Sequence, residues 1–305
     1  MALVILLYAL FASVFTVGKF GLESASPFFL VGSRMLIAGT MMLGYLFFRK
    51  RSEFRLEKEH FFQFLFLGIF NIYVTNACEF WGLKYLTSSK ACFLYSLSPF
   101  VSALLAYWML KEKMNPKKWL GLVIGFLGFI PILLNQTTQE ELTGHFLVFS
   151  WAELAVMTAA VSSVYGWIVL SKLVRAGYHP LMVNGVSMTL GGALTLVQSM
   201  IFETWNPVPV SDYATFFMVC AFLMTVSNFI CYNLYGYLLK RFSATFISFA
   251  GFTTPLITAL LGWLFLGENV NYSFFLSAGI VFTGLTLFYY EELRAVNVES
   301  EPVLA

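Results

Sequence analysis

Three ionisable side chains stand inside long apolar stretches of this sequence: Arg34, Glu79 and Glu153. A charged side chain within a membrane span costs roughly 3 kcal/mol or more unless it meets a partner or a water-filled cavity. An arginine would bind a carboxylate and an acid would bind an amine, so together they suit a zwitterionic solute. The alternative is that Arg34 and Glu79 only pair with each other and hold two helices together.

Neutral polar and aromatic side chains accompany these charges. A buried amide needs several hydrogen bonds, which a solute or water can supply. The asparagines expected near the middle of apolar segments are Asn76, Asn228 and Asn233. Aromatic rings beside them would stack on a planar ligand or attract a cation. These rings are Phe80, Trp81, Tyr95 and Trp167.

Composition indicates the solvent in which these residues work. The chain has 305 residues, of which 59% are hydrophobic and 11% are charged. Soluble domains carry about 25% charged residues, and a water-soluble fold could not hide so much apolar surface. The net charge of +2 is too small to indicate nucleic acid. The histidines fall in or near loops and the cysteines in apolar stretches, so we predict neither a metal site nor a cofactor.

The apolar stretches predict an all-α integral membrane protein of ten transmembrane helices. A helix needs about 20 residues to cross the hydrocarbon core. The expected spans are 2–20, 28–48, 61–83, 88–110, 117–134, 147–171, 180–202, 212–238, 243–266 and 272–290. The connections are short, so consecutive helices are antiparallel neighbours.

The positive charges predict the orientation, because Lys and Arg resist translocation. They concentrate in the loops on the side of both chain ends, whereas Lys19, Lys84 and Lys90 fall on the other side. Both termini are therefore expected in the cytoplasm, and an even number of spans agrees with this. On this topology Arg34 lies about 10 Å in from the outer face. Glu79, Glu153 and Lys19 fall on the same outer half and would converge there with Arg34.

Self-similarity divides the chain into two halves. Pro255 follows Pro99 by 156 positions, and the surrounding Phe, Ala, Leu, Glu and Asn residues repeat at the same spacing. Lys172 follows Lys19 by 153 positions, and Pro27, Gly32 and Gly39 recur at that spacing as well. A unit of five spans is odd, so the second copy would enter the membrane from the opposite side. We expect two inverted five-helix repeats over 1–134 and 147–290, followed by a cytoplasmic tail, 291–305.

The repeated segments also resemble a known family. Residues 96–99 (Ser-Leu-Ser-Pro) and 103–112, with their twin at 253–268 that ends in Leu-Leu-Gly-Trp-Leu-Phe-Leu-Gly-Glu, are similar to the signature of the drug/metabolite transporter superfamily, EamA-domain branch. The resemblance implies a central cavity and substrates such as amino acids, nucleotide-derived metabolites and drugs. The small four-helix exporters of that superfamily carry a proton-exchanging glutamate in the first helix. This chain has no acid there before Glu23, so that route is in doubt.

We therefore expect a secondary transporter of the cytoplasmic (inner) membrane that works by alternating access. Pro99 and Pro255 would act as gating elements, with Lys19 and Lys172 in gating or structural roles. The mixed charges and aromatics favour an amino acid or a nucleoside-bearing zwitterion such as S-adenosylmethionine. The alternative is a drug or toxic-metabolite exporter, and a membrane-embedded enzyme or a non-transporting scaffold are further readings. Expected partners are a small molecule and the lipid bilayer, but no nucleic acid. The coupling ion, and monomer against homodimer, stay open.

Overall fold

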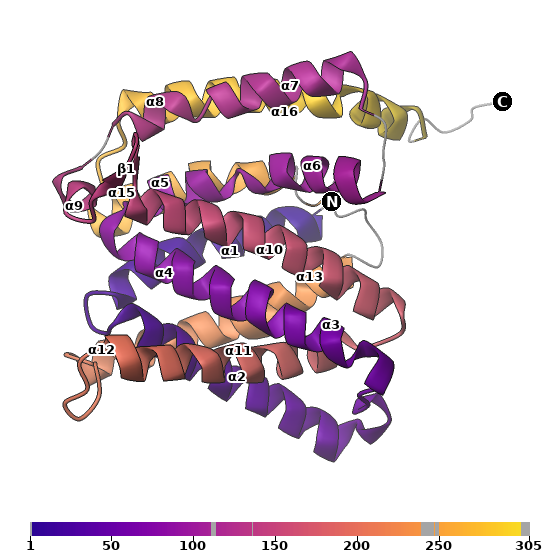
Figure 1. The fold of residues 1–305 in the computed structure, drawn as a ribbon, viewed down its shortest axis with the longest axis vertical. Helices are drawn as coiled ribbons and strands as arrows, with labels where there is room; N and C mark the ends of the chain where they lie inside the picture. The colour runs from indigo at the N-terminus through magenta and orange to yellow at the C-terminus, as the bar shows by residue number, and fades with distance from the viewer. Residues whose placement is uncertain (1, 111–113, 136, 239–246, 248–249, 300–305) are drawn as a thin grey trace.

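The fold is known from a computed structural model that describes residues 2–110, 114–135, 137–238, 247 and 250–299. It is built almost entirely of helices (Figure 1). Within the described residues, eight helical stretches are long and apolar enough to cross a membrane. They are Leu3–Gly21, Pro27–Arg49, Lys58–Tyr85, Pro116–Leu133, Trp151–Arg175, Pro180–Phe202, Tyr213–Leu238 and Tyr272–Tyr289. Each coincides with a span expected from the sequence.

The two other expected spans have a different form. The segment 88–110 is broken into α5 (Ser88–Tyr95) and α6 (Ser98–Leu110), which are each too short to cross a bilayer alone. In the segment 243–266, the turn η5 (Gly251–Thr253) leads into α15 (Thr254–Leu266), and most of the part before Ala250 lies outside the described residues. Pro99 occupies the second position of α6 and Pro255 the second position of α15, where proline costs a helix no hydrogen bond.

The helices pack in layers. In Figure 1, α7 (Pro116–Leu127) and α16 (Tyr272–Glu299) lie together along one edge. The opposite edge holds α2 (Pro27–Arg49) and α11 (Pro180–Phe202). The elements between them are α1 (Ala2–Gly21), α3 (Phe61–Phe66), η3 (Leu67–Val74), α4 (Thr75–Tyr85), α10 (Trp151–Arg175), α12 (Tyr213–Leu223), η4 (Met224–Cys231) and α13 (Tyr232–Leu238), together with α5, α6 and α15.

Glycines set the closest helix contacts. A Cβ at Gly39 of α2 would meet Thr189 N of α11 at 2.5 Å, and one at Gly192 of α11 would meet Leu36 N of α2 at 2.5 Å. A Cβ at Gly284 of α16 would likewise lie 2.5 Å from the backbone of α7. Small residues let membrane helices approach until their backbones touch. The glycines repeated along the sequence are therefore the residues that join the paired helices.

The connection between the halves is short. After α7 come α8 (Ile130–Leu133) and α9 (Thr138–Glu141), then the antiparallel pair β1 (His145–Phe146) and β2 (Phe149–Ser150).

Acidic side chains pair with the first N–H groups of two helices. Glu203, which follows α11, accepts hydrogen bonds from the backbone N–H groups of Phe28 and Phe29 in the first turn of α2. The carboxylate thus satisfies two amides that the helix leaves unpaired. Asp212 caps α12 in the same way, and the Thr215 hydroxyl and backbone N–H bonds lower the pKa of its carboxyl.

Candidate functional site

A cavity lies at the centre of the helices. It holds about 1070 Å³ of space between atoms, counting the part open to solvent. Its walls come from both halves of the sequence. The first half contributes α1, α2, α4, α5 and α6, and the second half contributes α10, η4, α13, η5 and α15. Arg34, Asn76, Glu79, Phe80, Tyr95, Pro99 and Trp167, all named from the sequence, line this cavity together.

Arg34 is the largest buried polar side chain of the site, and only 1% of its surface is exposed. Its Nη1 donates to Asn228 Oδ1 at 2.8 Å, and its Nη2 donates to Asn76 Oδ1 at 3.1 Å. The guanidinium also lies 4.8 Å from the centre of the Phe80 ring. Its Nε has no hydrogen-bond partner within the described chain. All of these partners are neutral, so the positive charge of Arg34 is not compensated by them.

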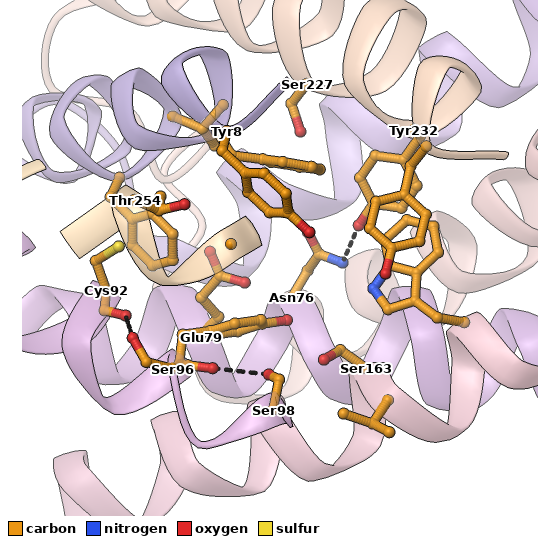
Figure 2. A pocket seen from close by; sticks show the side chains of 18 of the residues that line it. Tyr8, Asn76, Glu79, Cys92, Ser96, Ser98, Ser163, Ser227, Tyr232 and Thr254 are labelled. Atoms are coloured by element: carbon orange, nitrogen blue, oxygen red, sulfur yellow. Dashed lines mark hydrogen bonds between the residues drawn. The ribbon is translucent and has the colours of Figure 1, made fainter. Parts of the chain in front are cut away.

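Glu79 lines the same cavity but makes no such bonds. Although Arg34 and Glu79 both belong to the described residues, no ion pair joins them. No dashed line reaches the Glu79 carboxylate in Figure 2. The cavity therefore presents one cation and one anion that do not neutralise each other by contact. The alternative that these two residues serve only as a pair between helices predicts a direct ion pair, and none joins them within the described chain.

Aromatic rings form much of the remaining wall. The indole of Trp167 stacks on Tyr235 with ring centres 4.0 Å apart, and Tyr232 lies 5.3 Å from the same indole. The Tyr95 ring meets Phe15 edge to face. Tyr8 crosses from α1 to the other half, where its hydroxyl donates to the carbonyl of Ile247. Such rings offer flat faces to a planar ligand and negative faces to a cation.

Glu153 is placed elsewhere, in contrast to the expected convergence on Arg34. It is fully buried at the start of α10, where it closes a capping box with Ser150. Its Oε1 lies 2.7 Å from Lys90 Nζ, and the same ammonium bonds Glu140 and the carbonyl of Asn135. Lys90 and both glutamates are buried, so this cluster ties α5, α9 and α10 together. The helix-capping position explains why the carboxylate points away from the cavity.

Six other predicted residues do not line the cavity. Trp81 packs beside Tyr85. Asn233 accepts a hydrogen bond from Asn184 and donates to the backbone of η4. Lys19 donates to the carbonyls of Leu83 and Lys84, near the end of α4, where a cation is favoured. Lys172 is exposed in the last turn of α10. Asn228 and Pro255 lie outside the lining too, but Asn228 holds Arg34 directly.

Several lining residues were not among the predicted ones. They are Tyr8, Phe11, Phe15, Ser102, Ser163, Ser227, Tyr232, Tyr235 and Phe252. A signal existed for the first three, because spacings of three and four place Tyr8, Phe11 and Phe15 on one helix face. In a chain with 34 Phe, such a stripe does not stand out from lipid-facing or packing residues.

Taken together, the apolar helices and the central two-sided cavity are those of a membrane transporter. The profile of the EamA-like transporter family matches residues 1–134 and 150–290. The chain belongs to this family, which confirms the resemblance noted in the sequence. It is accordingly a transporter and not an enzyme. A solved structure with 18% sequence identity superposes with a TM-score of 0.66 over 98% of this chain and 96% of that one, which supports the fold.

Individual relatives carry more specific names. A Chlamydia muridarum protein named S-adenosylmethionine/S-adenosylhomocysteine transporter is 38% identical over 287 residues, which cover 93% of this chain and 90% of the relative. The Chlamydia trachomatis serovar D protein of the same name is 36% identical over 293 residues, covering 93% and 87%. The transporter YoaV of Bacillus subtilis is 26% identical over 88% of each chain.

Proposed function

We propose that this protein carries S-adenosylmethionine and S-adenosylhomocysteine across the inner membrane through the central cavity. The observation that carries the proposal is the pair Arg34 and Glu79. Both side chains line one buried cavity, Arg34 has only neutral partners, and Glu79 has no hydrogen bond or ion pair to the described chain. A buried charged side chain that makes no direct contact with a counter-charge is unfavourable. A zwitterionic amino-acid group would supply both missing partners at once.

The chemistry of the two solutes matches the walls of the cavity. The free N–H groups of Arg34 would receive the α-carboxylate, for which the planar guanidinium is well suited. Glu79 would receive the α-ammonium. The stacked rings of Trp167 and Tyr235 offer an aromatic platform for adenine, and ring faces attract the sulfonium of S-adenosylmethionine. S-adenosylhomocysteine lacks only the methyl group and its charge, so it would keep the other contacts.

The names of the chlamydial relatives support this substrate class, at identities of 36–38% over most of both chains. Both solutes have an amino-acid end and a purine end. The charged residues of the cavity suit the first, and the aromatic residues suit the second. A lipophilic drug would leave Arg34 and Glu79 buried without charged partners in direct contact. The geometry therefore favours the metabolite over the drug-exporter alternative.

We further propose ten spans in two inverted repeats, 1–134 and 147–290, with both termini and the tail 291–305 in the cytoplasm. Two observations support this arrangement. The glycines that recur at a spacing of 153 pack against the opposite helix where α2 contacts α11. Pro99 follows the turn at 96–97 and Pro255 follows the 3₁₀ turn η5, and the two prolines lie 156 positions apart. Rocking of the halves about the cavity, with hinges at those turns, would expose the site to each side in turn.

Binding to the purified protein tests the proposed function. Isothermal titration calorimetry in detergent would compare S-adenosylmethionine and S-adenosylhomocysteine with methionine and with adenosine. We expect both whole solutes to bind, and each fragment to bind at least about 100-fold more weakly because it satisfies only one part of the site. Equal affinity for adenosine and the whole solutes would contradict the roles given to Arg34 and Glu79.

A further inference from the structure

Two π-helical stretches interrupt long helices at matching places. η3 (Leu67–Val74) and η4 (Met224–Cys231) are both eight residues long. Each carries an asparagine at its fifth position, Asn71 or Asn228, and each is followed two residues later by another, Asn76 or Asn233. All of these matches have a spacing of 157 positions. Turns of π-helix are rare and are frequently found at functional sites.

The second asparagine of each pair closes its π-helix. Asn76 Nδ2 donates to the carbonyls of Asn71 and Ile72, at 3.4 and 3.0 Å. Asn233 Nδ2 donates to the carbonyls of Asn228 and Phe229, at 3.2 and 2.9 Å. The amide nitrogen is thus fixed against the helix backbone, and the amide oxygen is presented to a neighbouring helix. In the first half, that oxygen accepts from Arg34.

The first asparagine of the second pair reaches Arg34 from the other half of the chain. Asn228 is fully buried and does not line the cavity. Its Oδ1 accepts from Arg34 Nη1 at 2.8 Å, while its Nδ2 faces the sulfurs of Met35 and Met188, which are weak acceptors. An arginine only donates, so both amides must turn their oxygens toward it. Two neutral oxygens hold the guanidinium in place, and neither of them balances its positive charge.

We propose that Asn228 is a positioning residue for the solute carboxylate. It fixes Arg34 across the two halves, so that the remaining N–H groups of the guanidinium face the cavity, and it does not touch the solute itself. Asn228 has no role in binding the ammonium or the adenine, because no part of it reaches the cavity wall. The inference rests on the proposed function, since it assumes that Arg34 receives a carboxylate.

The test compares two ligands that differ only in that carboxylate: S-adenosylhomocysteine and its decarboxylated analogue. Their affinities for the full-length protein are measured by calorimetry in wild type, Asn228→Leu and Asn228→Asp. Leucine has a similar volume and removes the acceptor, whereas aspartate keeps an acceptor and adds a charge that would occupy Arg34. We expect each variant to bind S-adenosylhomocysteine at least about tenfold more weakly, the loss typical of one charged hydrogen bond. The decarboxylated analogue should change by less than about twofold.

Asn184→Leu is the matched control. Asn184 is also a fully buried asparagine, and it donates to Asn233 away from the cavity. Neither affinity should change in this variant. If both ligands weaken equally in the Asn228 variants, or if neither weakens, the positioning role is wrong. If wild type binds S-adenosylhomocysteine no better than the decarboxylated analogue, the carboxylate contact of the proposed function itself fails.

Discussion

Replacement of Glu79 by glutamine is the most informative perturbation of the cavity. Glutamine has nearly the same shape as glutamate but carries no charge. Glu79 is only 8% exposed, and no hydrogen bond or ion pair ties it to the described chain, so the substitution breaks no protein contact. Glu79→Gln is therefore expected to weaken ligand binding without lowering the stability of the fold.

The magnitude follows from the contact that Glu79 is proposed to make. A hydrogen bond between charged groups contributes about 1.5–3 kcal/mol, which corresponds to about a 10- to 150-fold change in Kd. Glu79→Gln should weaken S-adenosylmethionine and S-adenosylhomocysteine by this factor alike, because both carry the ammonium. Thermal unfolding should occur at the same or a higher temperature, since a buried carboxylate that makes no direct contact with a cation has been removed.

Calorimetry and thermal unfolding of the same purified samples provide the two readouts. Glu23→Gln is the control, because Glu23 is an exposed loop residue outside the cavity, and neither readout should change. A deaminated analogue of S-adenosylhomocysteine should bind wild type and Glu79→Gln within about twofold of each other. Unchanged affinity for both whole solutes in Glu79→Gln would refute the assignment, and so would a marked fall in the unfolding temperature.

Three further substitutions test other parts of the structure. Lys90→Met should lower the free energy of unfolding by about 3–5 kcal/mol, because it leaves the buried carboxylates of Glu140 and Glu153 without their cation; denaturation that matches wild type would show that the cluster does not stabilise the fold. Glu268→Ala removes the carboxylate that accepts hydrogen bonds from the N–H groups at the start of α5. It should lower the free energy of unfolding by about 1–2 kcal/mol in the same assay. A loss smaller than that caused by substitution of an exposed residue would contradict the capping role. Trp167→Leu should weaken the binding of S-adenosylhomocysteine by about 1–3 kcal/mol, because stacking on adenine is lost, but it should leave the affinity for methionine unchanged. An equal loss of affinity for both ligands would place the adenine elsewhere.

Much of the architecture was readable from the sequence because the bilayer restricts the choice of structure. Apolar stretches of about 20 residues had to become helices, and eight of the ten expected spans are found within the described chain. The interior breaks were harder to foresee. Pro99 indicated a local break, but the separation of α5 from α6 depends on how Ser96 and Ser98 bond to nearby carbonyls, which hydropathy does not report.

The site was predictable as far as charge inside a span is informative. Arg34 and Glu79 line the cavity, whereas Glu153 has the same chemistry and does not. The difference arises from the capping box with Ser150, which depends on the exact first residue of α10. Trp81 and Trp167 differ by which face of a helix meets the cavity, and this requires the packing of all the helices. Glu112, which corresponds to Glu268 in the repeated segments, lies outside the described residues.

The central claim is that one cavity binds this zwitterionic solute and delivers it to either side of the membrane. The most direct test is counterflow in proteoliposomes: vesicles loaded with unlabelled S-adenosylhomocysteine take up labelled S-adenosylmethionine from outside. We predict saturable uptake that is faster in loaded than in empty vesicles, and that is lost in Arg34→Met. Uptake no greater than in protein-free liposomes, with the protein folded and inserted, would contradict the account.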